Sequence, residues 1–158
     1  MSTTHDDVQL TQAGYDELVI ELKDIKDNKL PKAIERVATA RSFGDLSENS
    51  EYHAAREDLA FLEGRTAELE QLVANAKVIR VSKGKSMVSL GSTVKVHVGK
   101  SKSPHSYQIV GEWEANPKEK KISESSPLGM ALIGKKPGDE IEIDAPAGKI
   151  KYKIAEIE

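Results

Sequence analysis

One long apolar repeat constrains the fold of this chain more than any other feature of its sequence. The repeat occupies residues 52–76, where apolar or small residues are spaced strictly three and four positions apart. Its members are Tyr52, Ala55, Leu59, Leu62, Thr66, Leu69, Val73 and Ala76. This spacing is typical of a helix that packs along one seam against another helix. The segment therefore predicts a long helix with a coiled-coil seam.

A second segment, residues 15–37, carries the same spacing with one interruption. Its apolar members are Tyr15, Leu18, Leu22 and Ile25, followed after a slip of phase by Leu30, Ile34 and Val37. Pro31 lies at the slip, and we expect a break or kink there because proline removes a backbone donor. Two segments with small seam residues predict an intramolecular antiparallel hairpin in a monomer, instead of a long dimeric zipper. Periodicity alone favours a generic helical hairpin and indicates no function.

The second half of the chain has a different texture. From residue 82 onward, glycine and proline recur and apolar residues alternate with polar ones, which predicts a half-buried antiparallel sheet. The expected strands are Thr93–Val98, Tyr107–Trp113, Glu140–Asp144 and Ile150–Ile157. A short helix is expected from the capping Ser126 and Pro127 to Gly134. The fold class is therefore α+β, with domains at 1–80 and 81–158 joined near residues 81–87.

Composition and charge exclude several classes of function. The chain has no cysteine and only four histidines, so thiolate catalysis and cysteine-ligated metal sites are excluded. No uncharged apolar run is long enough to span a bilayer, and we expect a soluble, cytoplasmic protein. Residues 1–80 carry 10 basic and 16 acidic side chains, and residues 81–158 carry 13 and 10. Any nucleic acid is therefore expected to be met inside a larger complex.

An acidic cluster connects the two predicted helices. The stretch FGDLSENSE, residues 43–51, places Asp45, Glu48 and Glu51 at the turn of the hairpin, where Gly44 suits a helix C-terminus. Asp45 and Glu48 fit a capping box at the start of the second helix. They also fit a half-site for a hard divalent cation, which two side chains cannot hold tightly alone. Both interpretations remain open at this point.

The residues of this turn resemble those of a known family, the bacterial Gre transcript cleavage factors. The resemblance rests on LTQAGYDEL, GDLSENSEYHAARE, YQIVG, SSPLGMALIGKKPGDE and PAGKIKYKI, and it covers nearly the whole chain. It implies an N-terminal antiparallel coiled coil and a C-terminal FKBP-like domain. It also implies a factor that is not itself an enzyme. The resemblance further implies that the coiled coil enters the secondary channel of bacterial RNA polymerase and stimulates the polymerase's own cleavage of backtracked RNA.

The resemblance also assigns roles to individual residues. Asp45 and Glu48 match tip acids that help retain a second catalytic Mg²⁺ at the polymerase active centre, so Mg²⁺ is expected only in the complex. Arg41 and Arg56 match basic positions that meet the RNA 3′ end, although pairing with nearby acids explains them as well. Glu51 is as readily helix-surface charge as a third participant. Ser47 departs from the family, which often has a basic residue there, and this weakens the expected RNA contact.

The short helix of the second domain has two interpretations. Ser126, Pro127 and Met130 are candidates for the surface that docks on polymerase, whereas Leu128 and Leu132 are expected in the core. Two alternative functions remain. One is a Gre-like secondary-channel inhibitor of polymerase, against which the two acids of the tip count. The other, from a different class, is a chaperone or isomerase that uses the FKBP-like half.

Overall fold

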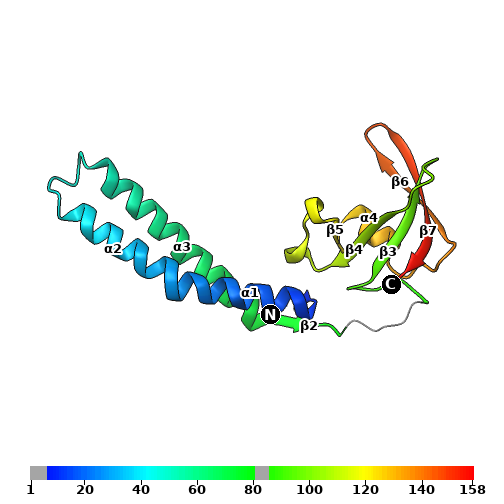
Figure 1. Cartoon of the computed structure of the whole chain (residues 1–158), viewed down its shortest axis with the longest axis horizontal. Helices are drawn as coiled ribbons and strands as arrows, with labels where there is room; N and C mark the ends of the chain where they lie inside the picture. The colour runs from blue at the N-terminus through cyan, green and yellow to red at the C-terminus, as the bar shows by residue number, and fades with distance from the viewer. Residues whose placement is uncertain (1–6, 81–85) are drawn as a thin grey trace, which may run out of the picture. The chain divides into compact units, whose positions relative to one another are not determined.

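The computed structural model describes residues 7–80 and 86–158, which form two compact units (Figure 1). The first unit contains residues 15–76, and the second contains residues 7–14 together with those from 77 onward. Residues 81–85 of the predicted connection lie outside the described residues. The domain boundaries 1–80 and 81–158 stay a prediction. No helix in the described part of the chain is long and apolar enough to cross a membrane.

The first unit is the expected antiparallel helical hairpin (Figure 1). One arm runs without a break through the helix α1, the π-helical segment η1 and the helix α2, and the helix α3 forms the other arm. Their bounds are α1 Gln12–Asp24, η1 Ile25–Lys29, α2 Leu30–Arg41 and α3 Ser50–Asn75. Residues 42–49 connect α2 to α3, and we call this connection the hairpin tip.

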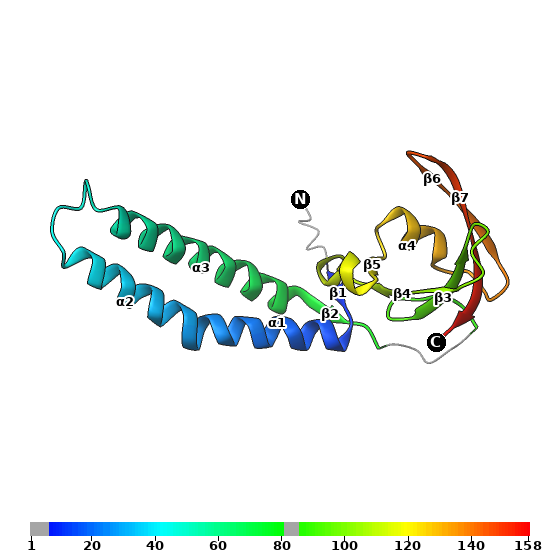
Figure 2. The ribbon, with the colours of Figure 1, turned by 45° about the horizontal axis from the view of Figure 1, so that its top comes forward.

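The π-helical segment explains the slip of phase in the sequence. The backbone N–H of Leu30 donates to the carbonyl of Ile25, five residues earlier, so one extra residue is accommodated just before Pro31. The helix is therefore not broken at the proline, but its course bends between α1 and α2 (Figure 2). Beyond the bend, Ala33 is buried and Ile34 is 53% exposed. The prediction that Ile34 lies in the seam was wrong by one position.

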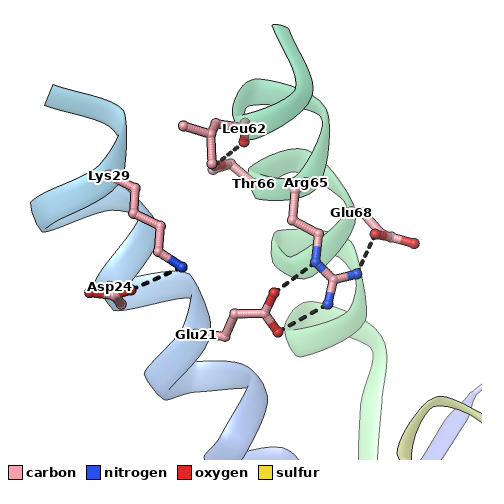
Figure 3. Close-up of polar contacts among 7 residues, drawn as sticks. All are labelled: Glu21, Asp24, Lys29, Leu62, Arg65, Thr66 and Glu68. Carbon is pink, nitrogen blue, oxygen red and sulfur yellow. Dashed lines mark hydrogen bonds and ion pairs between the residues drawn. The ribbon is translucent and has the colours of Figure 1, made fainter. Parts of the chain in front are cut away.

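The seam of α3 follows the predicted repeat. Tyr52, Ala55 and Leu69 are buried, and the other predicted members are half-buried. Leu72 is also buried, outside the predicted repeat. The hydroxyl of Thr66 donates to the carbonyl of Leu62 at 2.8 Å (Figure 3). The polar seam position is thereby satisfied within its own helix.

Charged pairs connect the arms outside the seam. Arg65 of α3 donates from two nitrogens to the carboxylate of Glu21 on α1, at 2.8 and 3.0 Å, and to Glu68 at 2.6 Å (Figure 3). The hydrogen bonds with Glu21, followed by those with Glu68, raise the pKa of Arg65 above its ordinary value. A bidentate pair of this kind favours one relative position of the two helices.

The second unit is built around a five-stranded sheet with the order β5-β4-β3-β7-β6. Its strands are β3 Thr93–Val98, β4 His105–Val110, β5 Lys121–Ser123, β6 Glu140–Ala145 and β7 Gly148–Ile157. Neighbouring strands are antiparallel except for β4 and β5, which are parallel. The helix α4, Pro127–Leu132, begins after the capping Ser126 as expected. The α+β fold class is confirmed, with a sheet that is mixed because of β5.

The core of the second unit gathers side chains from the sheet and α4. Val94, Val96, Ile109, Leu132 and Ile154 are almost completely buried, and Leu128 packs partly buried against them. The predicted placement of Leu128 and Leu132 in the core is thus confirmed. The predicted strand 107–113 ends earlier, at Val110, because a short 3₁₀ helix, η2 (Glu112–Glu114), follows Gly111. Trp113 lies in η2 and is 50% exposed.

Residues 7–14 join the second unit through polar contacts that the sequence did not indicate. The strands β1 (Val8–Leu10) and β2 (Ala76–Val78) pair with each other. The backbone N–H and the hydroxyl of Thr11 donate to the two carboxylate oxygens of Glu114, at 2.9 and 2.5 Å. A Cβ added at Gly14 would lie 2.0 Å from the Cδ of Glu114, so a larger residue there would have to displace this carboxylate from Thr11.

Candidate functional site: the hairpin tip

The hairpin tip presents two exposed carboxylates in one loop. Gly44 has a φ of +116°, which favours glycine, and directs the chain out of α2. Asp45 follows, and its Oδ1 accepts hydrogen bonds from the backbone N–H and the hydroxyl of Ser47, at 3.0 and 2.9 Å. These bonds, the backbone bond first, lower the pKa of Asp45. Its carboxylate is therefore ionised, and its bonds to Ser47 close a local Asx turn.

Glu48 is exposed, and no residue within 7–80 or 86–158 forms a hydrogen bond or ion pair with its carboxylate. The capping-box interpretation of Asp45 and Glu48 is wrong, because α3 begins later, at Ser50. Its N-cap is Asn49, whose side chain accepts from the backbone N–H of Tyr52 at 3.0 Å. The carboxylate of Glu48 is thus available to a ligand from outside the chain.

Glu51, the third acid of the cluster, differs from the other two. Its carboxylate accepts from Nε of Arg36 on α2 at 2.7 Å, and Arg36 also pairs with Asp58. Arg36 lowers the pKa of Glu51 through the hydrogen bond first and its charge second. Glu51 therefore links α3 to α2, whereas Asp45 and Glu48 form no ion pair with any residue in 7–80 or 86–158.

Arg41 and Arg56 are brought together from opposite arms by Tyr52. Their guanidinium carbons lie 5.7 and 5.8 Å from the centre of the Tyr52 ring, at distances where cation–π attraction operates. Nη2 of Arg41 also donates to the Tyr52 hydroxyl at 3.4 Å, and this bond lowers the pKa of Tyr52. In the described part of the chain neither arginine forms an ion pair with an acid, so the alternative interpretation, pairing with nearby acids, is wrong.

The two arginines border an open hollow on the surface of the hairpin. Its volume is about 380 Å³, and Glu63 lies at its edge. The hollow is lined by Val37, Arg41, Tyr52, Arg56, Leu59, Ala60 and Glu63. Two cations that pair with no acid among the residues the structure describes, beside one aromatic ring, give this face of the hairpin the charge needed to contact a phosphate.

Sequence reasoning missed the residue that holds the tip together. Asn49 is half-buried, caps α3 and also donates from Nδ2 to the carbonyl of Ala40 in α2 at 2.8 Å. A signal was present, since asparagine is a strong N-cap residue and the apolar repeat begins three residues later, at Tyr52. The capping role was instead assigned to Asp45 and Glu48, because their spacing fits a capping box.

The chain by itself offers an incomplete site for a metal ion. No group of three or more His, Cys, Asp or Glu side chains within the described ranges could hold an ion. Asp45 and Glu48 fit the preference of Mg²⁺ for carboxylate oxygen, but Mg²⁺ takes six oxygen ligands in octahedral geometry. These residues can thus contribute to an Mg²⁺ site only where a partner supplies the remaining ligands.

The candidate docking residues lie on the second unit at α4. The hydroxyl of Ser126 forms two hydrogen bonds within the second unit. Its Oγ accepts from the N–H of Gly129 at 3.0 Å and donates to the carbonyl of Ser123 at 2.6 Å. Pro127 is exposed, and Met130 is 63% exposed. The structure therefore groups the three residues on one short helix, and their docking role stays a prediction.

Comparison with known proteins gives the chain's family. Residues 8–78 match the model of the N-terminal domain of transcription elongation factors GreA and GreB, and residues 83–158 match that of the C-terminal domain. The chain is 49% identical to transcription elongation factor GreA of Nitrosococcus oceani, over 95% of this chain and 96% of the relative. It is 48% identical to that of Thermoanaerobacter pseudethanolicus, again over 95% and 96%.

A solved structure is also similar over nearly its whole length. The GreA factor homolog 1 (Gfh1) protein of Thermus thermophilus is 32% identical, with a TM-score of 0.45, covering 96% of this chain and 99% of that one. The two family models and the curated relatives together span both units of the chain. The chain belongs to the GreA/GreB family of transcription elongation factors.

Proposed function

We propose that this protein binds bacterial RNA polymerase, inserts its helical hairpin into the secondary channel and stimulates cleavage of the 3′ end of backtracked RNA. Arrested transcription complexes would thereby resume elongation in the bacterial cytoplasm. The protein is an accessory factor, and the catalytic centre belongs to the polymerase. One observation carries the proposal: Asp45 and Glu48 lie exposed in the hairpin tip, ionisable and unpaired with any cation of the described chain.

The two carboxylates would act as ligands to an Mg²⁺ ion shared with the polymerase. In two-metal hydrolysis a bound ion lowers the pKa of a water molecule and stabilises the leaving oxygen. Asp45 stays ionised because its turn with Ser47 lowers its pKa. Glu48 makes no competing contact with a described residue. The chain thus contributes negative charge and oxygen ligands, while the remaining ligands come from the polymerase and the RNA.

Arg41 and Arg56 would position the displaced RNA. A phosphate contact holds an RNA strand without reading its sequence, which suits a factor that acts on any arrested transcript. The support for this role is that both guanidinium groups flank Tyr52 and neither is neutralised by an acid of the described chain. Tyr52, which is only 6% exposed, keeps the two cations on the same face of the hairpin.

The second unit would dock on the surface of the polymerase. Met130 offers an exposed flexible apolar side chain on α4 beside Pro127, and exposed apolar residues of this kind are common at protein interfaces. Ser126 would contribute by fixing the first turn of α4, since its hydroxyl is already bonded within the fold.

The proposed function is tested on a stalled elongation complex that carries a backtracked, labelled transcript. Adding the protein with Mg²⁺ is expected to shorten the RNA from its 3′ end at a rate well above that of polymerase alone. The protein with RNA and Mg²⁺, but without polymerase, is expected to cleave nothing above background, because two carboxylates make an incomplete metal site. Robust cleavage without polymerase, or no stimulation with it, would contradict the proposal.

A further inference from the structure

We infer that Asn49 is a positioning residue, which sets the place of Asp45 and Glu48 by tying the end of α2 to the start of α3. The inference rests on the proposed function, because it concerns how the two acids are held for their task. Asn49 itself would contact neither the metal nor the RNA. Its effect passes through the backbone of the hairpin tip.

The side-chain amide of Asn49 spans the hairpin with both of its polar groups. Nδ2 donates to the carbonyl of Ala40 at 2.8 Å, and Oδ1 accepts from the backbone N–H of Tyr52 at 3.0 Å. Ala40 is buried and Asn49 is half-buried. One side chain therefore bonds the last turn of one helix and the first turn of the next.

The two hydrogen bonds of Asn49 are made to backbone groups at helix ends. The last carbonyls of α2 and the first N–H groups of α3 have no partners inside their own helices. Asn49 bonds one group of each kind, which requires a donor and an acceptor on the same short side chain, and it adds to the bond that the Ala40 carbonyl already accepts from the backbone N–H of Phe43 at 3.2 Å. Aspartate at this position would keep the acceptor and lose the donor. Serine would keep a cap but is one atom shorter, so it does not span to Ala40.

The consequence for the acids follows from the chain path. The bond between Asn49 and Ala40 closes a ring of residues 40–49, and both Asp45 and Glu48 lie inside it. Glu48 directly precedes Asn49, and Asp45 is bonded to Ser47 within the same ring. Metal ligands must be held within fractions of an ångström to act. Opening the ring should therefore displace both carboxylates together while the helices remain intact.

Two variants separate this role from simple helix capping. Asn49→Asp and Asn49→Ser both keep an N-cap oxygen for the Tyr52 N–H, and both lose the bond to the Ala40 carbonyl. They differ in charge, so an effect common to both variants is due to the lost bond. Asn75→Asp is the matched control, because it makes the same amide-to-acid change at an exposed residue of α3 far from the tip.

The experiment measures transcript cleavage in stalled complexes as a function of the concentration of the full-length factor. For both Asn49 variants we expect the half-saturating concentration to stay within about twofold of wild type, since docking is untouched. The maximal rate should fall roughly ten- to a hundredfold, as misplaced reacting groups do, and recover in part as Mg²⁺ is raised. Far-ultraviolet circular dichroism should show unchanged helix content, and Asn75→Asp should behave as wild type.

Each other outcome has a defined meaning. A wild-type maximal rate for either Asn49 variant would overturn the positioning role and leave the proposed function intact. A raised half-saturating concentration with an unchanged maximal rate would assign Asn49 to binding, which also overturns the inference. A fall in rate accompanied by lost helix content in both variants would show a structural role only. Absence of stimulated cleavage by the wild-type protein would overturn the proposed function itself.

Discussion

The acids of the hairpin tip differ in what surrounds each carboxylate. Asp45 accepts two hydrogen bonds from Ser47, Glu51 is paired with Arg36, and the Glu48 carboxylate forms no hydrogen bond or ion pair with a residue of the described chain. Hydrogen bonds and positive charge both favour the ionised form of a carboxyl group. The pKa values of Asp45 and Glu51 are accordingly lowered. Three acidic residues of one short segment thus differ in role, since Glu51 links the two helices whereas Asp45 and Glu48 do not.

The pair between Glu51 and Arg36 predicts a defined dependence of stability on pH. Because Arg36 lowers the pKa of Glu51 in the folded state, the pair stabilises the fold above the ordinary pKa of glutamate. That contribution is lost as the pH falls through the lowered pKa. Thermal unfolding of wild type and Glu51→Gln should therefore differ slightly near neutral pH and converge in strong acid. A difference that grew on acidification would contradict the assigned pair.

At the scale of the helices, the apolar repeat correctly predicted the features that depend on local sequence alone. The seam of α3, the antiparallel hairpin and the turn at Gly44 all follow from spacing and from glycine. The π-helical segment was visible only as a slip of phase beside Pro31. Periodicity records that a residue has been added, but either a kink or a π turn can accommodate it. The position of Ile34 was misassigned for this reason.

The change of phase at η1 predicts effects of very different size for the same substitution at two isoleucines. Ile25 is 2% exposed and Ile34 is 53% exposed. Ile25→Ala should lower the free energy of unfolding by about 2–4 kcal/mol, as expected for a buried cavity. Ile34→Ala should change it by less than about 0.5 kcal/mol. Denaturant unfolding of the two variants measures both values, and equal losses would mean that Ile34 belongs to the seam after all.

The candidate site could be predicted only in part, because some of its contacts join residues that are distant in the sequence. The motif FGDLSENSE contains Asp45 and Glu48, so their position in the turn could be predicted from the sequence. Asn49 was overlooked because its second bond reaches Ala40, nine residues earlier and in another helix. The contact of Arg41 and Arg56 with one tyrosine ring also depends on the packing of two helices. Such contacts arise only once the hairpin has formed.

At the scale of the whole molecule, the sequence indicated two parts but not how residues are shared between them. Residues 7–14 belong to the second unit, although they precede the hairpin in the chain. The contact of Thr11 with Glu114 joins residues 103 positions apart. The parallel pairing of β5 with β4 likewise depends on a connection through η2 and η3, Pro117–Glu119. Short strands with distant partners carry little local signal.

The docking role of the second unit predicts a loss of binding without a loss of fold. Met130→Glu places a charge on an exposed side chain of α4, so the free energy of unfolding should change by less than about 0.5 kcal/mol. Competition with labelled wild-type protein for polymerase should show weaker binding, by roughly tenfold if Met130 is a central contact. Trp113→Glu, at another exposed apolar residue of this unit, is the control. Equal effects of the two variants would place docking elsewhere.

In the complex of the protein with its partner, we expect Asp45 and Glu48 of the hairpin tip to act as metal ligands. Asp45→Asn combined with Glu48→Gln keeps the shape of both side chains and removes their charge, which a hard cation requires. Asp27→Asn combined with Glu57→Gln removes two exposed carboxylates of the same hairpin outside the tip. Both double variants should fold and bind polymerase as wild type does.

The most direct measurement is the rate of transcript cleavage in a stalled elongation complex at low Mg²⁺ and a saturating concentration of factor. We expect the Asp45→Asn, Glu48→Gln variant to lose nearly all stimulated cleavage, with partial recovery as Mg²⁺ or Mn²⁺ is raised, while the control variant retains it. Cleavage at the wild-type rate by the tip variant would contradict the assignment of Asp45 and Glu48 as metal ligands.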